Sequence, residues 1–374
     1  KGLEFLGIYT GPILALTLGM PIIRRIADLA KAEKLTSVAD FIAARYGKNS
    51  TVAMIVAIIA LVGAIPYIAL QLKAVSSSVA TMVDPGDYGI GSGNLYFLDL
   101  PLVVTLVMAG FAVMFGTRHT DATEHQDGLI LAISMESLVK LVAMCTVGFY
   151  VLFVLFDGPA HLWQLATANE EAMRAVTYHT PVSRWIVMTL LSGFAIILLP
   201  RQFHVTVVEN RTPEELRMAG FLLPLYLIAI NIFVLPIALA GILTLGANGD
   251  ADLYVLQLPL FNGVPVVSLI TFIGGFSAAT AMVIVASVAL SIMVSNDILM
   301  PIFLRQKLLT RSPHSDDFAK TLLNIRRTAI FIVLLLGYCY YRAADSTSGL
   351  ASIGLLAFAA IAQMAPSLFG GLLW

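Results

Sequence analysis

Residues 128–156 read GLILAISMESLVKLVAMCTVGFYVLFVLF, a long apolar run interrupted by two full charges, Glu136 and Lys140. A helix needs about 20 mostly apolar residues to cross the hydrocarbon core of a bilayer, so this run predicts a membrane-spanning helix. The whole chain has the same character, because 59% of its 374 residues are hydrophobic and only 12% are charged. Soluble domains carry about 25% charged residues. The composition therefore predicts an integral membrane protein.

Eight further stretches are apolar and long enough, or nearly so, to span a bilayer. With the first run they predict nine spans, over residues 3–23, 52–82, 100–117, 128–156, 185–204, 218–246, 265–297, 326–342 and 348–374. The eighth is short, but the arginines at its ends can extend to the membrane surface. The residue-by-residue alternation of a β-barrel is absent from the sequence, so the predicted fold class is all-α.

The positions of the basic residues predict the orientation, because cytoplasmic loops carry an excess of Lys and Arg. With the N-terminus outside, most of the 22 basic residues fall in cytoplasmic loops, and the outer side holds only Lys1, Arg174, Arg184 and Arg342. The sequence therefore predicts a multi-pass protein whose N-terminus is outside and whose C-terminus is inside.

The loops and the chain ends give three further expectations. Residues 24–51 are predicted as a cytoplasmic loop, and residues 160–176 as one amphipathic helix on the outer face. Lys1 is not an initiator residue and no cleavage site follows it, so we expect a fragment of a longer chain. No linker or low-complexity tract divides residues 1–374, which are predicted to form one domain.

Other classes of function lack support in the sequence. The net charge of -1 gives no sign of a nucleic-acid partner. The six histidines show no metal-ligand spacing, so we predict neither a metal site nor a cofactor. A membrane enzyme would need a catalytic motif such as GxSxG, and the sequence has none. These residues are therefore not expected to form an enzyme.

Five segments together carry a recognisable set of motifs. They are LTSVADFIAARYG (35–47), Thr-Asp (120–121), PRQFHVTVVEN (200–210), GGFSAA (274–279) and Asn-Asp (296–297). The set resembles the sodium/solute symporter family. The resemblance implies a fold similar to that of the leucine transporter, with two inverted five-helix repeats and a binding site at mid-membrane. That fold needs ten core helices, and matching the motifs implies that the first core helix is missing. The fragment alone is therefore not expected to transport a solute.

Four segments are closer to one branch of that family, the transporter-like modules of bacterial sensor histidine kinases. They are YIALQLKAVSSS (67–78), TRHTDATEHQDG (117–128), ESLVKLVA (136–143) and LLPRQFHVTVVEN (198–210). This resemblance implies a bacterial inner membrane protein, an amino-acid solute such as histidine, and a fused or downstream kinase with its response regulator. The chain itself has no kinase catalytic motif.

The family's sodium site is altered in this sequence. The resemblance implies adjacent Ser and Thr hydroxyls on the helix that corresponds to residues 265–297, but alignment on Asp297 puts Ala281 and Met282 there. Neither side chain has an oxygen to offer a hard cation. Ser277 and Thr280 are the nearest hydroxyls, and a register shift of one residue would bring in Thr280. We expect that Na⁺ does not couple at this site.

Glu136 and Lys140 are unfavourable in a predicted span, since each charge at a helix centre raises the free energy of membrane insertion by about 2.5–3.5 kcal/mol. Their i, i+4 spacing places them on one helical face. One hypothesis is an internal ion pair with a purely structural role. The other is that the Lys140 ammonium occupies the place of sodium, so that its protonation replaces sodium binding and H⁺ is the coupling ion.

Further polar residues within the spans are candidates for the solute site. Tyr67 and Gln71 lie one turn apart and could face a cavity or bond to another helix. Tyr9 and Thr10 match the substrate-contact positions of related sugar transporters. Gln363 could be a cavity amide or bond between helices.

Two other features have equally open alternatives. Ser192, Gly193 and Pro200 bracket the fifth span where the family's fold unwinds a helix, which would free backbone groups for a zwitterionic ligand; a simple proline kink is the alternative. Asp121 resembles the family's ion-exit aspartate, and it could equally cap the helix that follows.

Two hypotheses for function follow from these observations. In the first, the module binds a small solute, such as an amino acid, in mid-membrane and carries it or reports it to a kinase. In the second, it is an ordinary proton- or sodium-coupled symporter with no signalling role.

Overall fold

The computed structural model describes residues 2–83, 94–95, 98–116, 127–246, 249–305, 315–344 and 349–373. The α-helices run over Leu6–Thr17 (α1), Met20–Glu33 (α2), Val38–Arg45 (α3), Ser50–Val83 (α4), Leu100–Gly116 (α5), Asp127–Tyr150 (α6), Pro159–Ala168 (α7), Glu170–Val176 (α8), Val182–Leu198 (α9), Pro200–Phe203 (α10), Pro213–Asn231 (α11), Val234–Leu245 (α12), Tyr254–Phe261 (α13), Pro265–Met293 (α14), Met300–Arg305 (α15), Ser315–Ala343 (α16), Leu350–Ala362 (α17) and Ala365–Leu373 (α18).

Short elements complete the fold. A 3-10 turn covers Gly2–Phe5 (η1), and π-helical stretches cover Val151–Leu155 (η2), His204–Val208 (η3) and Val294–Leu299 (η5). The strands Asn94–Leu95 (β1) and Leu98–Asp99 (β2) pair antiparallel.

The structure confirms the prediction of a helical integral membrane protein. Six helices of the described chain are long and apolar enough to cross a membrane, and two bent helix pairs raise the number to eight. The helix α5 is a shorter apolar helix at the place of the third predicted span. The eighth predicted span, expected to be short, lies in an apolar helix of 24 residues, Lys320–Ala343.

The two bent pairs modify the first and fifth predicted spans. The first bends by 66° between Thr17 and Met20, and the second by 52° between α9 and α10. In the second pair Leu199 has extended backbone angles. A residue before proline is disfavoured in the helical region, so Pro200 explains this break.

Two predicted loops or helices have a different form in the structure. Residues 24–51 are not a simple loop, because α2 continues from the first span and α3 follows it. The buried positions of α2 follow the spacing of one helical face: Met20, Ile23, Ile26, Ala27 and Ala30. The predicted helix over 160–176 is two helices, because Asn169 ends α7 and its side chain caps α8.

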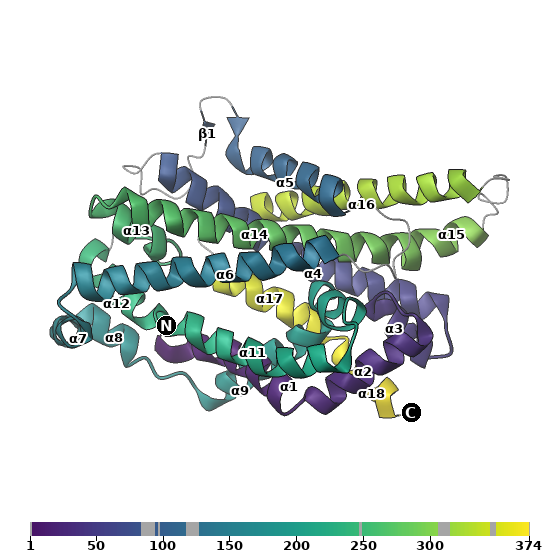
Figure 1. Cartoon of the computed structure of the whole chain (residues 1–374), viewed down its shortest axis with the longest axis horizontal. Coiled ribbons are helices and arrows are strands. Elements are labelled where there is room, and N and C mark those ends of the chain that lie inside the picture. The colour runs from purple at the N-terminus through teal and green to yellow at the C-terminus, as the bar shows by residue number, and fades with distance from the viewer. Residues whose placement is uncertain are drawn as a thin grey trace.

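The long helices run side by side along one axis (Figure 1). The N-terminus lies toward the end that holds α7, α8 and α13, and the C-terminus toward the end that holds α2 and α3. We call these the outer and inner ends, after the predicted orientation. The helix α14 is the most buried of the candidate spans. Large apolar side chains remain exposed on α6, as expected where a helix faces lipid: Leu131, Leu138, Val142 and Phe149.

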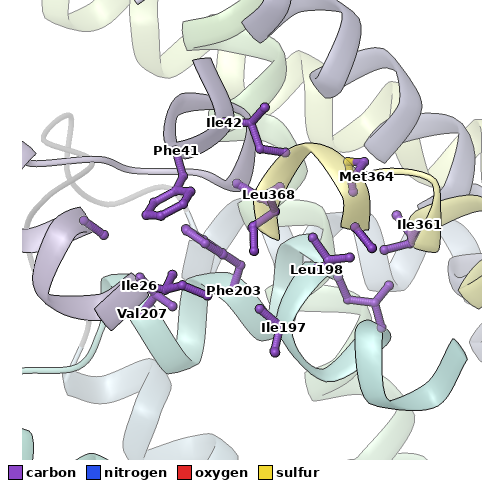
Figure 2. Packing of buried hydrophobic residues seen from close by; sticks show 14 of the residues in the cluster. Ile26, Phe41, Ile42, Ile197, Leu198, Phe203, Val207, Ile361, Met364 and Leu368 are labelled. Carbon is purple, nitrogen blue, oxygen red and sulfur yellow. The ribbon is translucent and has the colours of Figure 1, made fainter. Parts of the chain in front are cut away.

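The inner end is filled by an apolar cluster built from segments far apart in the sequence. Figure 2 shows Phe41 of α3 beside Phe203 of α10, with Leu368 of α18 nearby. The two aromatic rings meet edge to face at 6.0 Å. This cluster ties the helices of the inner end together.

The contact between α1 and α9 depends on Gly11. A Cβ atom at this position would collide with the carbonyl oxygen of Thr189 and the hydroxyl of Ser192. Backbone atoms in a packed helix pair cannot move aside cheaply, so the contact requires glycine.

We therefore predict that Gly11→Ala lowers the free energy of unfolding by about 1–3 kcal/mol, despite the better helix propensity of alanine. Thermal unfolding in detergent measures this change. Gly110→Ala on α5 is the matched control, because a Cβ there meets no atom within 4 Å. Equal stability of the two variants would contradict the required close approach.

Candidate functional site

The charged residues of α6 lie where α6 packs against α14. A Cβ atom at Gly274 would collide with Ala143 and would lie 3.8 Å from the Cα of Lys140. The two helices run antiparallel (Figure 1). With a rise of about 1.5 Å per residue, Lys140 is therefore roughly level with Ser277, and Glu136 with Ala281. Lys140 of the fourth predicted span thus lies beside the seventh, about one helical turn from Ala281.

A cavity of about 310 Å³ opens next to this contact. Lys140 lines it together with groups from six other parts of the fold, including Tyr9 on α1, Asn231 on α11 and Thr271 on α14. The wall also includes Asp252 and Leu253, which precede α13 at the outer end. The cavity therefore reaches from the interior lysine toward the outer end of the bundle.

A second cation, Arg201, enters the same region from α10. Its Nη1 atom donates a hydrogen bond to the Tyr67 hydroxyl at 3.2 Å, and that hydroxyl lies 3.4 Å from the Met282 sulfur and donates to it. The chain Arg201–Tyr67–Met282 thus links α10, α4 and α14. Met282, predicted at the sodium position, accepts a hydrogen bond here and supplies no oxygen.

Glu136, Lys140 and Arg201 form an electrostatic triad. The charges of Lys140 and Arg201 both act on Glu136, and those of Glu136 and Arg201 both act on Lys140. Glu136 is 5% exposed, and its Oε2 atom has no hydrogen-bond partner in the described structure. The described side chains of Glu136 and Lys140 form no direct salt bridge, so the simple ion pair of the first hypothesis is not present in this conformation.

Other polar atoms around the triad are also buried without partners in the described residues. The Tyr226 hydroxyl and the Asn231 Oδ1 atom are two of these. The Tyr226 hydroxyl lies close enough to Glu136 and Tyr9 to interact electrostatically with both. Nearly all buried polar groups in proteins form hydrogen bonds, so unpaired groups beside a cavity indicate a place for a polar ligand or water.

Some of the predicted site residues come together and others do not. Tyr9, Tyr67, Glu136, Lys140 and Met282 meet in the region described above. Gln71 is buried one turn along α4 from Tyr67, and Ser277 and Ala281 are partly buried on α14. These positions stay candidates for the solute or ion site.

Two predicted hydroxyls bond within their own helices. The Thr10 hydroxyl donates to the Leu6 carbonyl, and the Thr280 hydroxyl donates to the Phe276 carbonyl, both at 2.7 Å. Neither residue lines the cavity. Each would have to leave this bond before it could serve a ligand.

Ser192 and Gly193 have a packing role in this structure. The helix α9 continues through both residues, and the break falls later, at Leu199 and Pro200. The Ser192 hydroxyl donates to the Gly7 carbonyl at 3.2 Å across the α1–α9 contact. The prediction that these two residues sit at an unwound ligand site is therefore not met in this conformation, because close helix packing occupies them.

Gln363 and Asp121 lie outside the assembled site. Gln363 is exposed, and its amide donates to the Ala359 carbonyl at 3.3 Å, so it does not line the cavity. Asp121 lies outside the described residues.

Arg201, Tyr226 and Asn231 belong to this region although no sequence pattern singles them out. The excess of Lys and Arg in cytoplasmic loops predicts Arg201 at the inner side, but the break at Pro200 turns it toward Tyr67 in the interior. Its position directly after a proline at the end of an apolar span was the available signal. Tyr226 and Asn231 are five positions apart on α11, which puts them about 140° apart around the helix, so no same-face spacing in the sequence connects them.

A second polar contact closes the inner end. The Ser37 hydroxyl donates to Asp297 Oδ2 at 3.0 Å, and the same hydroxyl accepts from the Asp40 backbone N–H at 2.9 Å. Asp297 is 3% exposed and lies in the π-helical η5. The motifs around residues 37–40 and 296–297 therefore meet in space.

The comparisons with known proteins agree with the membrane fold. The chain is 23% identical over 241 residues to an uncharacterized symporter of Bacillus subtilis, YhjB, and the match covers 62% of this chain and 45% of that protein. The matched region thus spans less than half of the relative. No family model matches the chain. The apolar helices and this similarity identify a multi-pass, transporter-like helical membrane protein.

We predict that Glu136→Gln destabilises the protein by about 3 kcal/mol, because it leaves Lys140 and Arg201 buried without their anion. The double variant Glu136→Gln/Lys140→Met restores the net charge of the triad, so it should regain much of that loss. Denaturant unfolding of the three proteins measures both effects.

Glu170→Gln is the control for that experiment, since the Glu170–Arg174 pair is exposed and should contribute less than about 1 kcal/mol. If Glu136→Gln and Glu170→Gln lower the free energy of unfolding equally, the charge of Glu136 contributes no more to stability than that of an exposed ion pair.

Proposed function

We propose that this chain is the solute-binding part of a membrane transporter or transporter-like sensor. It binds a small solute in the cavity beside Lys140, at the centre of the membrane. The observation that carries the proposal is the cavity itself, with a charged triad and unpaired polar groups on one side and a path toward the outer end. Intramembrane ionisable groups facing a cavity commonly mark substrate or ion pathways.

An amino acid such as histidine is the first candidate solute. The support is the resemblance of residues 67–78, 136–143 and 198–210 to the transporter modules of sensor kinases. The cavity supplies groups of both polarities, since Lys140 and Asp252 line it together. In the whole protein the bound state would be carried across the membrane, reported to a fused or downstream kinase, or both.

The coupling ion is H⁺ in this proposal. Ala281 and Met282 supply no side-chain oxygen, and Met282 is engaged with Tyr67. The Thr280 hydroxyl is bonded within its helix. Lys140 lies beside α14, about one helical turn from Ala281. Its ammonium can therefore supply the positive charge that sodium would otherwise bring.

The alternative is an ordinary symporter without a signalling role. The name of the Bacillus subtilis relative favours this alternative, since it is called a symporter. Both versions place the solute in the same cavity.

The test is uptake of radiolabelled histidine by the full-length protein in proteoliposomes. We expect uptake to require an inward proton gradient, to be unaffected by replacing Na⁺ with K⁺, and to fall at least tenfold in Lys140→Met. Uptake that requires Na⁺ and is undiminished without a proton gradient would refute proton coupling. Absence of both uptake and binding, for histidine and other amino acids, would refute the proposed solute site.

A further inference from the structure

The triad beside the cavity has an excess of positive charge. Lys140 and Arg201 are cations, and Glu136 is the anion between them. Glu136 and Arg201 are the described groups whose charges act on Lys140. These three groups together therefore carry one net positive charge. An uncompensated charge in a low-dielectric interior is strongly unfavourable, so a negative charge in the cavity would offset this excess.

The Lys140 ammonium is positioned to bind that negative charge. It lines the cavity, and it has no hydrogen-bond partner among the described residues. Arg201 donates from Nη1 to Tyr67 and has a buried Nε atom without a partner, but it does not line the cavity. An ammonium forms its strongest hydrogen bonds with a carboxylate or phosphate oxygen. A single carboxylate neutralises the excess charge, whereas a dianionic phosphate would reverse its sign.

The rest of the cavity fits an apolar group. Beyond Lys140 the wall consists mainly of apolar side chains, among them Met144, Ile230, Val234, Leu256 and Phe272. The volume of about 310 Å³ equals roughly ten water molecules at ~30 Å³ each. This is the size of an amino acid or a short carboxylic acid. Asp252 lines the cavity at its outer end, where its carboxylate accepts a hydrogen bond from the Leu350 backbone N–H at 2.9 Å.

We infer that the site selects its solute by the carboxylate group, which Lys140 binds, while the cavity receives the remainder of the molecule as a largely apolar group. The solute class is therefore a monocarboxylate, and an α-amino group is tolerated but not required. This inference rests on the proposed function, because it assumes that the cavity is the solute site.

The inference also explains how solute and proton could be coupled. A protonated Lys140 attracts the carboxylate, and a neutral Lys140 releases it, because only the ammonium offsets the charge of the solute. Solute and proton then enter the interior as an electrically neutral pair.

The experiment compares sets of molecules that differ only in their charged groups, measured by calorimetry on the full-length protein in lipid nanodiscs. One set is histidine, imidazolepropionate and histamine, and a second is leucine, 4-methylpentanoate and isoamylamine. We expect the amino acid and the acid of at least one set to bind within tenfold of each other. The amine of that set should bind at least 100-fold more weakly.

Lys140 variants add a second measurement. Lys140→Met should abolish binding of both acids, and Lys140→Arg should retain it, since the guanidinium keeps the charge. Arg174→Met is the control, because it removes a cation from an exposed pair that does not line the cavity. The comparison of ligands on the unaltered protein does not depend on the folding of any variant.

Each outcome has a separate meaning. Equal binding of amine and acid, or binding of the amino acid without the simple acid, would overturn selection by the carboxylate and leave the solute site standing. Binding of acids that survives in a folded Lys140→Met would overturn the role of Lys140. If no member of either set binds, both this inference and the proposed amino-acid function fail.

Discussion

The interior of this bundle depends on keeping three charged side chains together in a low-dielectric environment. Each of them alone would cost several kcal/mol at the centre of a membrane. Glu136 and Lys140 share one face of α6, and Arg201 reaches them from α10. Helix α14 can approach α6 closely there because Gly274 has no side chain. The break at Pro200, the close α6–α14 contact and the cavity are thus parts of one arrangement.

The sequence predicts much of this arrangement, for a different physical reason at each residue. The spans follow from apolar runs, and the pair Glu136 and Lys140 stands out because charges are rare in such runs. The face of α2 could also have been predicted, since Ile23, Ile26, Ala27 and Ala30 follow helical spacing. The basic residues Arg24 and Arg25 lie among these apolar positions, and their charge favours the prediction of a cytoplasmic loop.

The remaining features depend on tertiary contacts that the sequence does not encode locally. Ser192 and Gly193 are candidates for a ligand site because the family resemblance implies an unwound helix there, but small residues also suit close helix packing, and here Gly11 lies against them. Arg201 closes the fifth predicted span, where the excess of cytoplasmic Lys and Arg predicts it at the inner side, whereas the 52° bend at Pro200 redirects it toward Tyr67. Only the packed structure separates these alternatives.

The short helix α3 has a mechanical consequence. The residue that caps its start, Ser37, donates to Asp297 of η5, and at its last turn Arg45 Nε donates to the Gly371 carbonyl of α18 at 2.8 Å. Tyr46 adds a bond to the Ser367 carbonyl. Helix α3 is therefore fastened at one end to η5, which continues α14, and at the other end to α18. Eight residues of α3 thus fix the spacing between the helix that lines the cavity and α18.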